Sequence, residues 1–331
     1  MVKKTKNIAL QLLKILFSAG IIYWLVQSGK LNFAALRNLL TPGIILLSFA
    51  IILLNGLLTS ERWRMLVKSQ GIPAKAWPSF KLTLIGQFFN FAMPGGVGGD
   101  VIKAFYFTRD NPGTKVVAVT SVLMDRVLGM YAMILMALVV MFYDFQHVET
   151  VSTLMTLFWF ILTLAIVFTI ALGLVFSTKI YETNLLKRII RKLPLAEKFM
   201  KLYESLHLYG NHLPRIIQVI VLSLLSQSAS IVFLYMVGQV SGYSEIPLKT
   251  YFLVAPLGFM ATAIPISPAG VGVGQAAFYF LFNVYTGNST EVGPTTITAF
   301  QVASFLVSLL GAFFYMRYKR PNDMSEAADM A

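Results

Sequence analysis

The stretch Met93-Pro-Gly-Gly-Val-Gly-Gly-Asp100 interrupts an apolar segment that covers residues 80–107. A similar stretch, Pro265-Ile-Ser-Pro-Ala-Gly-Val-Gly-Val-Gly274, interrupts a second apolar segment at residues 251–285. Proline and clustered glycine break a helix, and backbone groups freed inside a bilayer must be covered by protein or by a wet cavity. Each segment is therefore predicted to form two half-helices joined by an irregular turn, as a re-entrant unit.

Further apolar runs surround these two segments, and each is long enough to cross the hydrocarbon core, which takes roughly 20 residues. They cover residues 8–27, 42–59, 115–142, 153–176, 216–239 and 295–316. The composition agrees, because 57% of the 331 residues are apolar and only 12% are charged, against about a quarter in soluble domains. The sequence predicts an all-α integral membrane protein with about six full transmembrane helices and two broken segments.

The two interruptions share the pattern P-x-G-V-G, at residues 94–98 and 268–272. In both halves of the chain, residues 1–145 and 150–320, the predicted order is span, span, broken segment, span. Three spans per half is an odd number, so the second half must be inverted relative to the first. Inverted repeats with broken helices that meet near the midplane are typical of secondary transporters. We expect one membrane domain, residues 1–331, built as an inverted 3+3 repeat.

The distribution of cations predicts the orientation. The chain has 27 Lys and Arg against 14 Asp and Glu, an excess that in this context indicates the cytoplasmic membrane surface rather than nucleic acid. With the N-terminus inside, the predicted cytoplasmic loops, among them 60–79 and the basic loop 177–215, hold 22 of the 27 cations. The outer loops hold Lys30, Arg37 and Lys249, and predicted helices hold Lys14 and Arg126. We expect a multi-pass protein of the cell inner (cytoplasmic) membrane with both termini cytoplasmic.

The first interruption is a candidate binding site for an anion. It leads into an apparent short helix at residues 101–107, with Lys103 one turn in. A helix N-terminus favours phosphate or carboxylate, and glycine lets a head group approach the backbone closely. The candidate residues here are Gly95, Gly96, Gly98, Gly99, Asp100 and Lys103. The structural alternative is that glycine only permits the turn and that Asp100 is an N-cap.

Charged residues inside the third span form a second candidate site. Asp125 and Arg126 lie about ten residues into the span, at a depth of about 15 Å. Charges at that depth are costly and usually face the bundle interior or a water-filled path. The structural alternative is an ion pair with another helix, for example with Arg62 at the end of the preceding span. Arg62 is itself part of Glu61-Arg62-Trp63-Arg64, a pattern also typical of interfacial anchors.

Several kinds of chemistry lack the residues they need. Cysteine is absent, no Walker A motif occurs, and the three histidines show no metal-ligand spacing. The sequence therefore predicts no catalytic residue, no metal site, no cofactor and no nucleic-acid partner.

At these residues the sequence resembles the transmembrane, flippase-like region of lysylphosphatidylglycerol synthases and the stand-alone proteins that share it. The resemblance covers nearly the whole chain. It rests on Arg62-Trp-Arg64, Met93–Asp100 with Lys103, Asp125-Arg126-Val-Leu-Gly129, and Pro268-Ala-Gly-Val-Gly-Val-Gly-Gln275. It implies movement of aminoacylated or other polar lipids between leaflets, and it adds Gly270, Gly272 and Gln275 to the candidate substrate-binding residues.

Two features depart from that family. Its second motif usually ends in Glu, whereas this chain has Gln275, which cannot ionise. A soluble aminoacyltransferase domain is also missing from the chain, so we expect no synthesis of the lysyl lipid.

The leading hypothesis is a lipid translocase, flippase or scramblase, whose partner is a membrane phospholipid or glycolipid. Arg126 and Lys103 would hold the lipid phosphate, and Asp100 and Asp125 would orient those cations or bind a cationic head group. An intramembrane enzyme that acts on lipid head groups is the alternative from another class. A third possibility is a non-transporting partner of a lipid-modifying enzyme. The oligomeric state, the head group and the energy source are left open.

Overall fold

The fold of the chain is helical throughout the part that the structure describes. The structure is a computed structural model, and it describes residues 23, 27, 41–92, 98–183, 185–192, 194–264 and 267–318. Among these residues, five helical stretches are long and apolar enough to cross a membrane: Pro42–Ser69, Lys115–Tyr143, Ser152–Phe176, Ala196–Val240 and Val292–Met316. The prediction of an all-α membrane protein is confirmed. The predicted span at 8–27 lies almost wholly outside the described residues.

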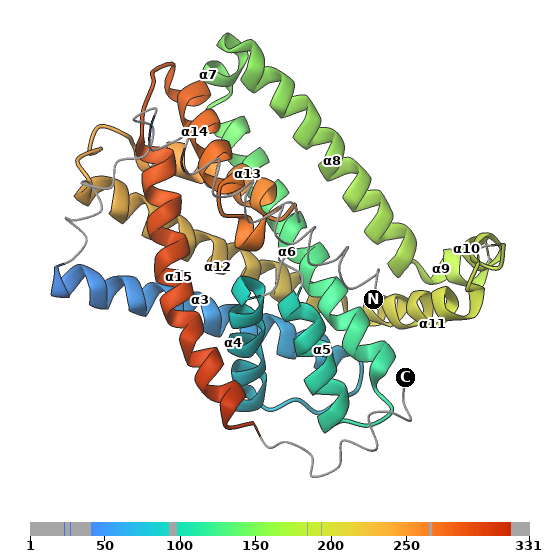
Figure 1. The fold of residues 1–331 in the computed structure, drawn as a ribbon. Coiled ribbons are helices and arrows are strands. Elements are labelled where there is room, and N and C mark those ends of the chain that lie inside the picture. Colours follow the sequence, from blue (N-terminus) through green and yellow to red (C-terminus); the bar gives the residue numbers. More distant parts are fainter. Residues whose placement is uncertain are drawn as a thin grey trace, which may run out of the picture.

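The long helices alternate with shorter ones along the chain (Figure 1). In chain order the elements are α3 (Pro42–Ser69), α4 (Ala76–Ala92), α5 (Gly98–Asp110), α6 (Lys115–Tyr143), α7 (Phe145–Thr150), α8 (Ser152–Phe176), α9 (Thr178–Glu182), α10 (Leu185–Ile190), α11 (Ala196–His207), η1 (Leu208–His212), α12 (Leu213–Val240), α13 (Leu248–Thr262), η2 (Pro268–Gly270), α14 (Val273–Thr286) and α15 (Val292–Met316).

The first predicted interruption separates α4 from α5. The two helices pack closely because both contribute a glycine to the contact: a Cβ on Gly99 would overlap the carbonyl oxygen of Gly86. The Asn90 side-chain oxygen also accepts a hydrogen bond from the Gly99 N–H at 3.0 Å. The predicted break into two half-helices is therefore confirmed, and the α4–α5 pair is a tight helical hairpin.

The second predicted interruption separates α13 from α14, with the short η2 between them. Gly270 has φ +71°, and a Cβ there would lie 2.6 Å from the Thr262 Cβ. Only glycine meets both demands without strain. The prediction of two half-helices is confirmed here as well, whereas their re-entrant course and the inverted repeat stay predictions.

The hairpins pack against the long helices (Figure 1). Helix α3 packs along α12, and α4 packs along α15. Helix α13 contacts α6, and α14 contacts α15. The largest core cluster contains nearly fully buried aromatic rings of α12, α13 and α14, among them Phe233, Tyr251, Phe278 and Phe282. Helix α8 lies at the edge of the bundle and exposes Trp159, Phe160, Ile166 and Ile170, which suits contact with lipid chains.

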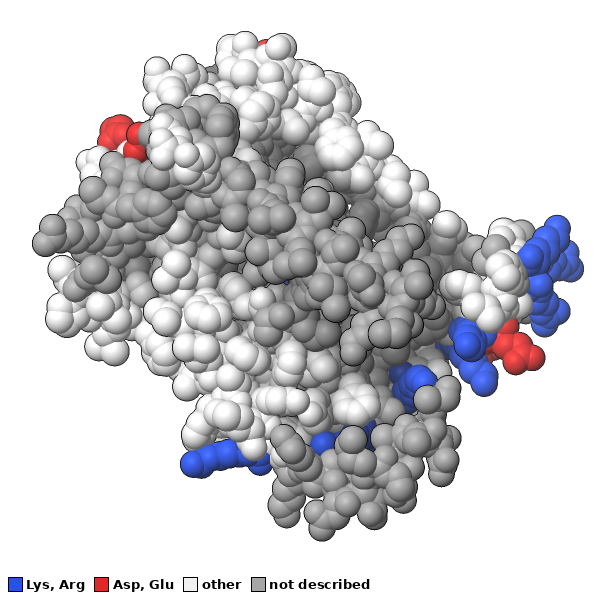
Figure 2. Space-filling view, in the orientation of Figure 1, with Lys and Arg blue, Asp and Glu red and all other residues white. Residues whose placement is uncertain are grey.

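The ends of the helices gather charge of opposite kinds. At one end, which we call the basic end, lie Lys68, Lys75, Arg109, Lys115, Arg215 and Arg317, and Arg215 donates to the Lys68 carbonyl at 3.4 Å. At the other end, the acidic end, lie Asp144, Glu245 and Glu291 with Lys249. Figure 2 shows cations along the lower and right sides of the molecule, with an acidic group among those at the right, and further acids near the top.

Two sequence-based boundaries differ from the structure. The predicted loop at 60–79 is wrong at both ends, because α4 begins at Ala76 and α3 continues to Ser69. Apolar residues Trp63, Leu66 and Val67 are fully buried there, so tertiary packing extends the helix beyond the charged Glu61-Arg62 pair. The predicted basic loop at 177–215 contains the helices α9, α10, α11 and η1.

Candidate functional site

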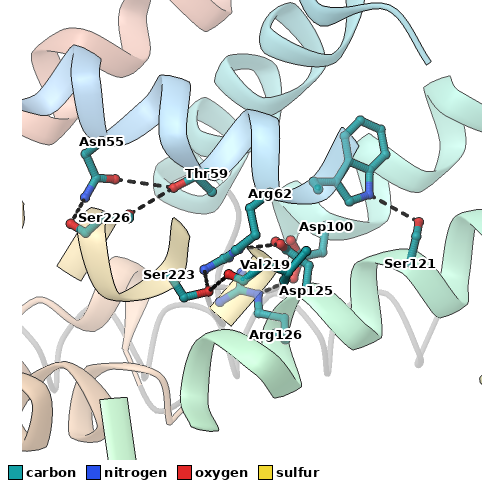
Figure 3. A network of polar contacts seen from close by, with 11 residues as sticks. Asn55, Thr59, Arg62, Asp100, Ser121, Asp125, Arg126, Val219, Ser223 and Ser226 are labelled. Atoms are coloured by element: carbon teal, nitrogen blue, oxygen red, sulfur yellow. Dashed lines mark hydrogen bonds and ion pairs between the residues drawn. The ribbon is translucent and has the colours of Figure 1, made fainter. Parts of the chain in front are cut away.

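A buried ion pair joins α3 to α6. The Arg62 Nε donates to the Asp125 Oδ1 at 2.7 Å, and the two side chains are only 10% and 11% exposed. Arg62 also donates to the Ser223 hydroxyl of α12 at 3.2 Å (Figure 3). Gly129, one turn after Asp125, makes room for the guanidinium, since a Cβ there would lie 3.1 Å from Nη1. The sequence-based alternative of an ion pair between the third span and Arg62 is therefore confirmed for Asp125.

A second ion pair joins α5 to α6 beside the first. The Arg126 Nε donates to the Asp100 Oδ2 at 2.6 Å. Asp125 and Arg126 point about 100° apart on α6, so each meets a different helix. Asp100 lies in the first turn of α5, not before it as an N-cap would. The N–H groups of this turn favour a carboxylate.

Lys103 is the third cation of the site and is buried. Its Nζ lies over the Trp63 ring, 4.0 Å from the ring centroid. A hydrogen bond at the edge of the ring holds it in place, because the Trp63 Nε1 donates to the Ser121 hydroxyl at 3.2 Å. A cation over a desolvated tryptophan face is stabilised by the ring quadrupole, and both Asp100 and Asp125 attract this ammonium group.

The structure therefore gathers five of the sequence-predicted residues, Arg62, Asp100, Lys103, Asp125 and Arg126, into one group, which we call the charge cluster. It contains three cations and two carboxylates, so it has one positive charge in excess. Arg126 is its most exposed cation, with a side chain 45% exposed. Asp125 lies ten residues after the start of α6, so the cluster lies about 15 Å from the basic end. A site of this kind can attract a single negative charge into the bundle.

A row of small polar side chains extends from the charge cluster between α3 and α12. Asn55 donates to the Ser230 hydroxyl at 2.7 Å. It also donates to the Ser226 carbonyl at 2.9 Å, and the Thr59 and Ser226 hydroxyls lie 3.4 Å apart (Figure 3). Sequence reasoning missed this row. Its signal was available in the spacing, because Asn55, Thr59 and Arg62 share one helix face at i, i+4 and i+7.

The glycines at the two turns have different surroundings. Gly95 and Gly96 lie outside the described residues. Gly98 is the first residue of α5, and Gly99 packs directly on the α4 backbone. Position 99 must be glycine because a side chain there would prevent the close packing of α5 on α4.

The second turn is held by its own hydrogen bonds to α15. The Gln275 oxygen accepts from the Gly272 N–H at 2.7 Å, and its amide nitrogen donates to Gln301 at 2.7 Å and to Thr298 at 3.1 Å. A carboxylate at position 275 could accept but not donate. Gln275 thus stabilises the turn that contains Gly270 and Gly272, and its hydrogen-bond partners lie in that turn and on α15.

The acidic end contains a further polar group that sequence reasoning did not single out. The Asp144 carboxylate accepts from Lys249 at 3.0 Å and from the Tyr285 hydroxyl. Partial burial acts to raise the pKa of Asp144, but these hydrogen bonds and the Lys249 charge outweigh it, so the pKa lies below its ordinary value. The group borders an open cavity of about 780 Å³. Among the described residues, no group of three or more His, Asp or Glu could hold a metal ion.

Comparisons with known proteins agree with the motifs. Residues 11–311 match the family model described as the lysylphosphatidylglycerol synthase TM region. The UPF0104 membrane protein of Methanocaldococcus jannaschii is 23% identical to this chain, over 97% of this chain and 98% of that protein. No solved structure matches the chain.

Proposed function

The chain belongs to the lysylphosphatidylglycerol synthase transmembrane-region family, a lipid-related family of multi-pass membrane proteins, and on that premise we propose that it moves a phosphate-bearing polar lipid between the two leaflets of the cytoplasmic membrane. The head group would pass through the polar interior of the bundle while the acyl chains stay in the lipid. The substrate class is a phospholipid or glycolipid with at least one phosphate.

The observation that carries this proposal is the charge cluster with its single excess positive charge. A phosphodiester has one negative charge, so its arrival would neutralise the cluster. An unbalanced charge is costly at a depth of about 15 Å. The cluster therefore favours an anionic ligand over a neutral one. The row of hydroxyl and amide groups that begins at Ser223 and reaches Asn55 offers hydrogen bonds to a polar head group farther along the spans.

The cations of the cluster differ in their suitability for this task. Arg62 is held on both sides, by Asp125 and by Ser223, which suits a fixed structural charge. Arg126 is far more exposed, and its planar guanidinium can offer two parallel N–H donors to phosphate oxygens. Lys103 contributes a point charge from the α5 side. We assign the phosphate contact to Arg126 and Lys103.

A pair of matching contacts supports the inverted arrangement of the two halves. The Tyr285 hydroxyl, near the end of α14, donates to Asp144, just after α6. The Tyr318 hydroxyl, just after α15, donates to Asp110, the last residue of α5. Each hairpin is thus tied at its end to the last long helix of the other half, with the two contacts at opposite ends of the molecule. If the two ends of the molecule opened alternately, the Tyr285–Asp144 contact would break when one end opened and the Tyr318–Asp110 contact when the other end opened.

The orientation follows from the same two ends. We place the basic end in the cytoplasm, because cations are retained on that side. Single cysteines test this directly, since the chain has no native cysteine. A cysteine at the exposed Lys201 should react with an impermeant reagent only after the cells are opened, whereas a cysteine at Ser289 should react in intact cells. The reverse pattern would overturn the placement.

The deciding experiment is reconstitution of the purified protein in liposomes that contain head-group-labelled phospholipids. An impermeant quencher reports how much label changes leaflet with time. The intact protein should accelerate that exchange, and Arg126→Gln should abolish the acceleration while folding normally. Arg64→Gln is the matched control, because Arg64 lies on α3 outside the charge cluster and pairs with Glu61.

The same liposomes distinguish the competing classes. A mass spectrum of the recovered lipids would show a chemically altered head group if the protein is an intramembrane enzyme. Unchanged lipids with no accelerated exchange would favour a non-transporting partner of a lipid-modifying enzyme. Normal exchange by a well-folded Arg126→Gln protein would refute the phosphate contact assigned here.

A further inference from the structure

An apolar groove lies between α6, α8 and α11, and no residue of the charge cluster lines it. Its volume is about 280 Å³. All of its lining side chains are apolar: Leu123, Met124, Val127, Val167, Phe168, Ala171, Leu172, Val175 and Leu206. Apolar cavities of this kind stay dry, and at membrane depth the available occupant is a hydrocarbon chain.

The groove has defined ends. Toward the acidic end, the Tyr131 ring stacks on Phe168, and the Tyr131 and Thr169 hydroxyls lie 2.8 Å apart. Toward the basic end, α11 contacts α8 and adds Leu206 to the lining. The next residue, His207, donates from Nδ1 to the Val175 carbonyl of α8 at 3.0 Å and so holds α11 at this end of the groove. The groove therefore runs from the bilayer interior toward the basic end, which is how an acyl chain of that leaflet lies.

A concentration of cations borders the basic end of the groove. We call residues 178–207, which contain α9, α10 and α11, the basic ledge. It has seven Lys and Arg, namely Lys179, Lys187, Arg188, Arg191, Lys192, Lys198 and Lys201, against three Glu. Figure 2 shows cations gathered at the right-hand edge of the molecule, where Figure 1 places α9, α10 and α11.

The basic ledge is fixed to the bundle. The Ser205 hydroxyl lies 2.8 Å from the Thr120 hydroxyl of α6 and 3.0 Å from the Gln70 side-chain oxygen. His207 stacks on the Tyr181 ring with centroids 4.0 Å apart. These contacts position α11, which contains Lys198 and Lys201, relative to the groove.

We propose that the groove and the basic ledge together bind one anionic phospholipid of the leaflet at the basic end, with an acyl chain in the groove and its phosphate on α11. Lys198 and Lys201 are exposed and lie three residues apart, so they share a helix face. Lys201 precedes Leu206 by five residues, about 7.5 Å along the helix axis. The bound lipid is a resident ligand, and its binding does not depend on the proposed translocation.

Lipid retention by the purified protein tests this proposal. The protein in mild detergent is given phosphatidylglycerol or phosphatidylcholine with identical acyl chains, and native mass spectrometry counts the lipids that stay bound. One phosphatidylglycerol should be retained, with a preference over phosphatidylcholine of about 30-fold from two lysines near the surface. The double variant Lys198→Gln/Lys201→Gln should reduce that preference to about threefold or less. Lys75→Gln/Lys115→Gln, which removes exposed cations elsewhere on the basic end, should leave it unchanged.

A second arm tests the groove itself. Ala171→Trp fills the groove and should abolish retention, and the smaller Ala171→Leu should weaken it. Ile170→Trp is the matched control, because Ile170 is 56% exposed on α8 and does not line the groove. Retention of phosphatidylglycerol by folded Ala171→Trp or Ala171→Leu protein at the level of Ile170→Trp would overturn the proposal. Equal retention of the two lipids by the unaltered protein would overturn the role of the basic ledge.

Discussion

The ion pair between Arg62 and Asp125 predicts an asymmetry between two single substitutions. Both side chains are about nine-tenths buried and 2.7 Å apart, so removal of either partner strands a charge inside the bundle. Breaking a buried pair from one side costs about 3–5 kcal/mol. Asp125→Asn should be the more damaging change, because it leaves both Arg62 and Lys103 without this carboxylate and raises the excess of the charge cluster to two positive charges. Arg62→Gln instead brings that excess to zero.

A double-mutant cycle measures the pair itself. The variant Arg62→Gln/Asp125→Asn removes both charges and should recover at least half of the stability lost in Asp125→Asn. The measurement is thermal unfolding of the purified protein in one detergent at pH 7. A loss of 3–5 kcal/mol in a chain of this size corresponds to roughly 10 °C. If the two single losses add within about 0.5 kcal/mol, the residues are uncoupled and the reasoning from the buried pair fails.

Three other substitutions test the remaining contacts. Arg126→Lys should restore only part of the translocation that Arg126→Gln loses in liposomes, because an ammonium lacks the planar fork that suits phosphate oxygens; full activity would count against a two-donor contact. Gly99→Ala should destabilise the protein by about 1–3 kcal/mol in thermal unfolding, since its Cβ would overlap the Gly86 carbonyl, whereas Gly173→Ala, which meets open space, should change stability by less than about 0.5 kcal/mol. Asp144 has a pKa below the ordinary 3.8 in the folded protein, so its contribution to stability is complete above pH 3.8 and is lost as the pH falls through the folded pKa. The difference in stability between the unaltered protein and Asp144→Asn should therefore shrink as the pH is lowered. A difference that stays constant would contradict the lowered pKa of Asp144.

The sequence by itself determined the helical elements and their interruptions. Long apolar runs must be helical inside a bilayer because the backbone has no other partner there, and the described spans fall where those runs lie. Proline and clustered glycine within residues 93–99 and 265–274 disfavour an unbroken helix, so the breaks between α4 and α5 and between α13 and α14 were predictable. The charged residues within the third predicted span were also recognisable from the sequence, since Asp125 and Arg126 would be costly on a lipid-facing helix surface.

Only the tertiary structure decided which of these groups meet. Arg62 and Asp125 are 63 residues apart in the chain, and Asp100 and Arg126 are 26 apart; local spacing fixes the face on which a side chain lies but not the helix that faces it. The extension of α3 to Ser69 likewise depends on the packing that buries Trp63 and Leu66. The basic ledge was predicted as a loop because its charge pattern was interpreted and its helical pattern was not. Helix α11 (Ala196–His207) consists largely of good helix formers, so it was predictable, whereas the short α9 and α10 are marginal when isolated and contact α8 and α11 in the folded protein.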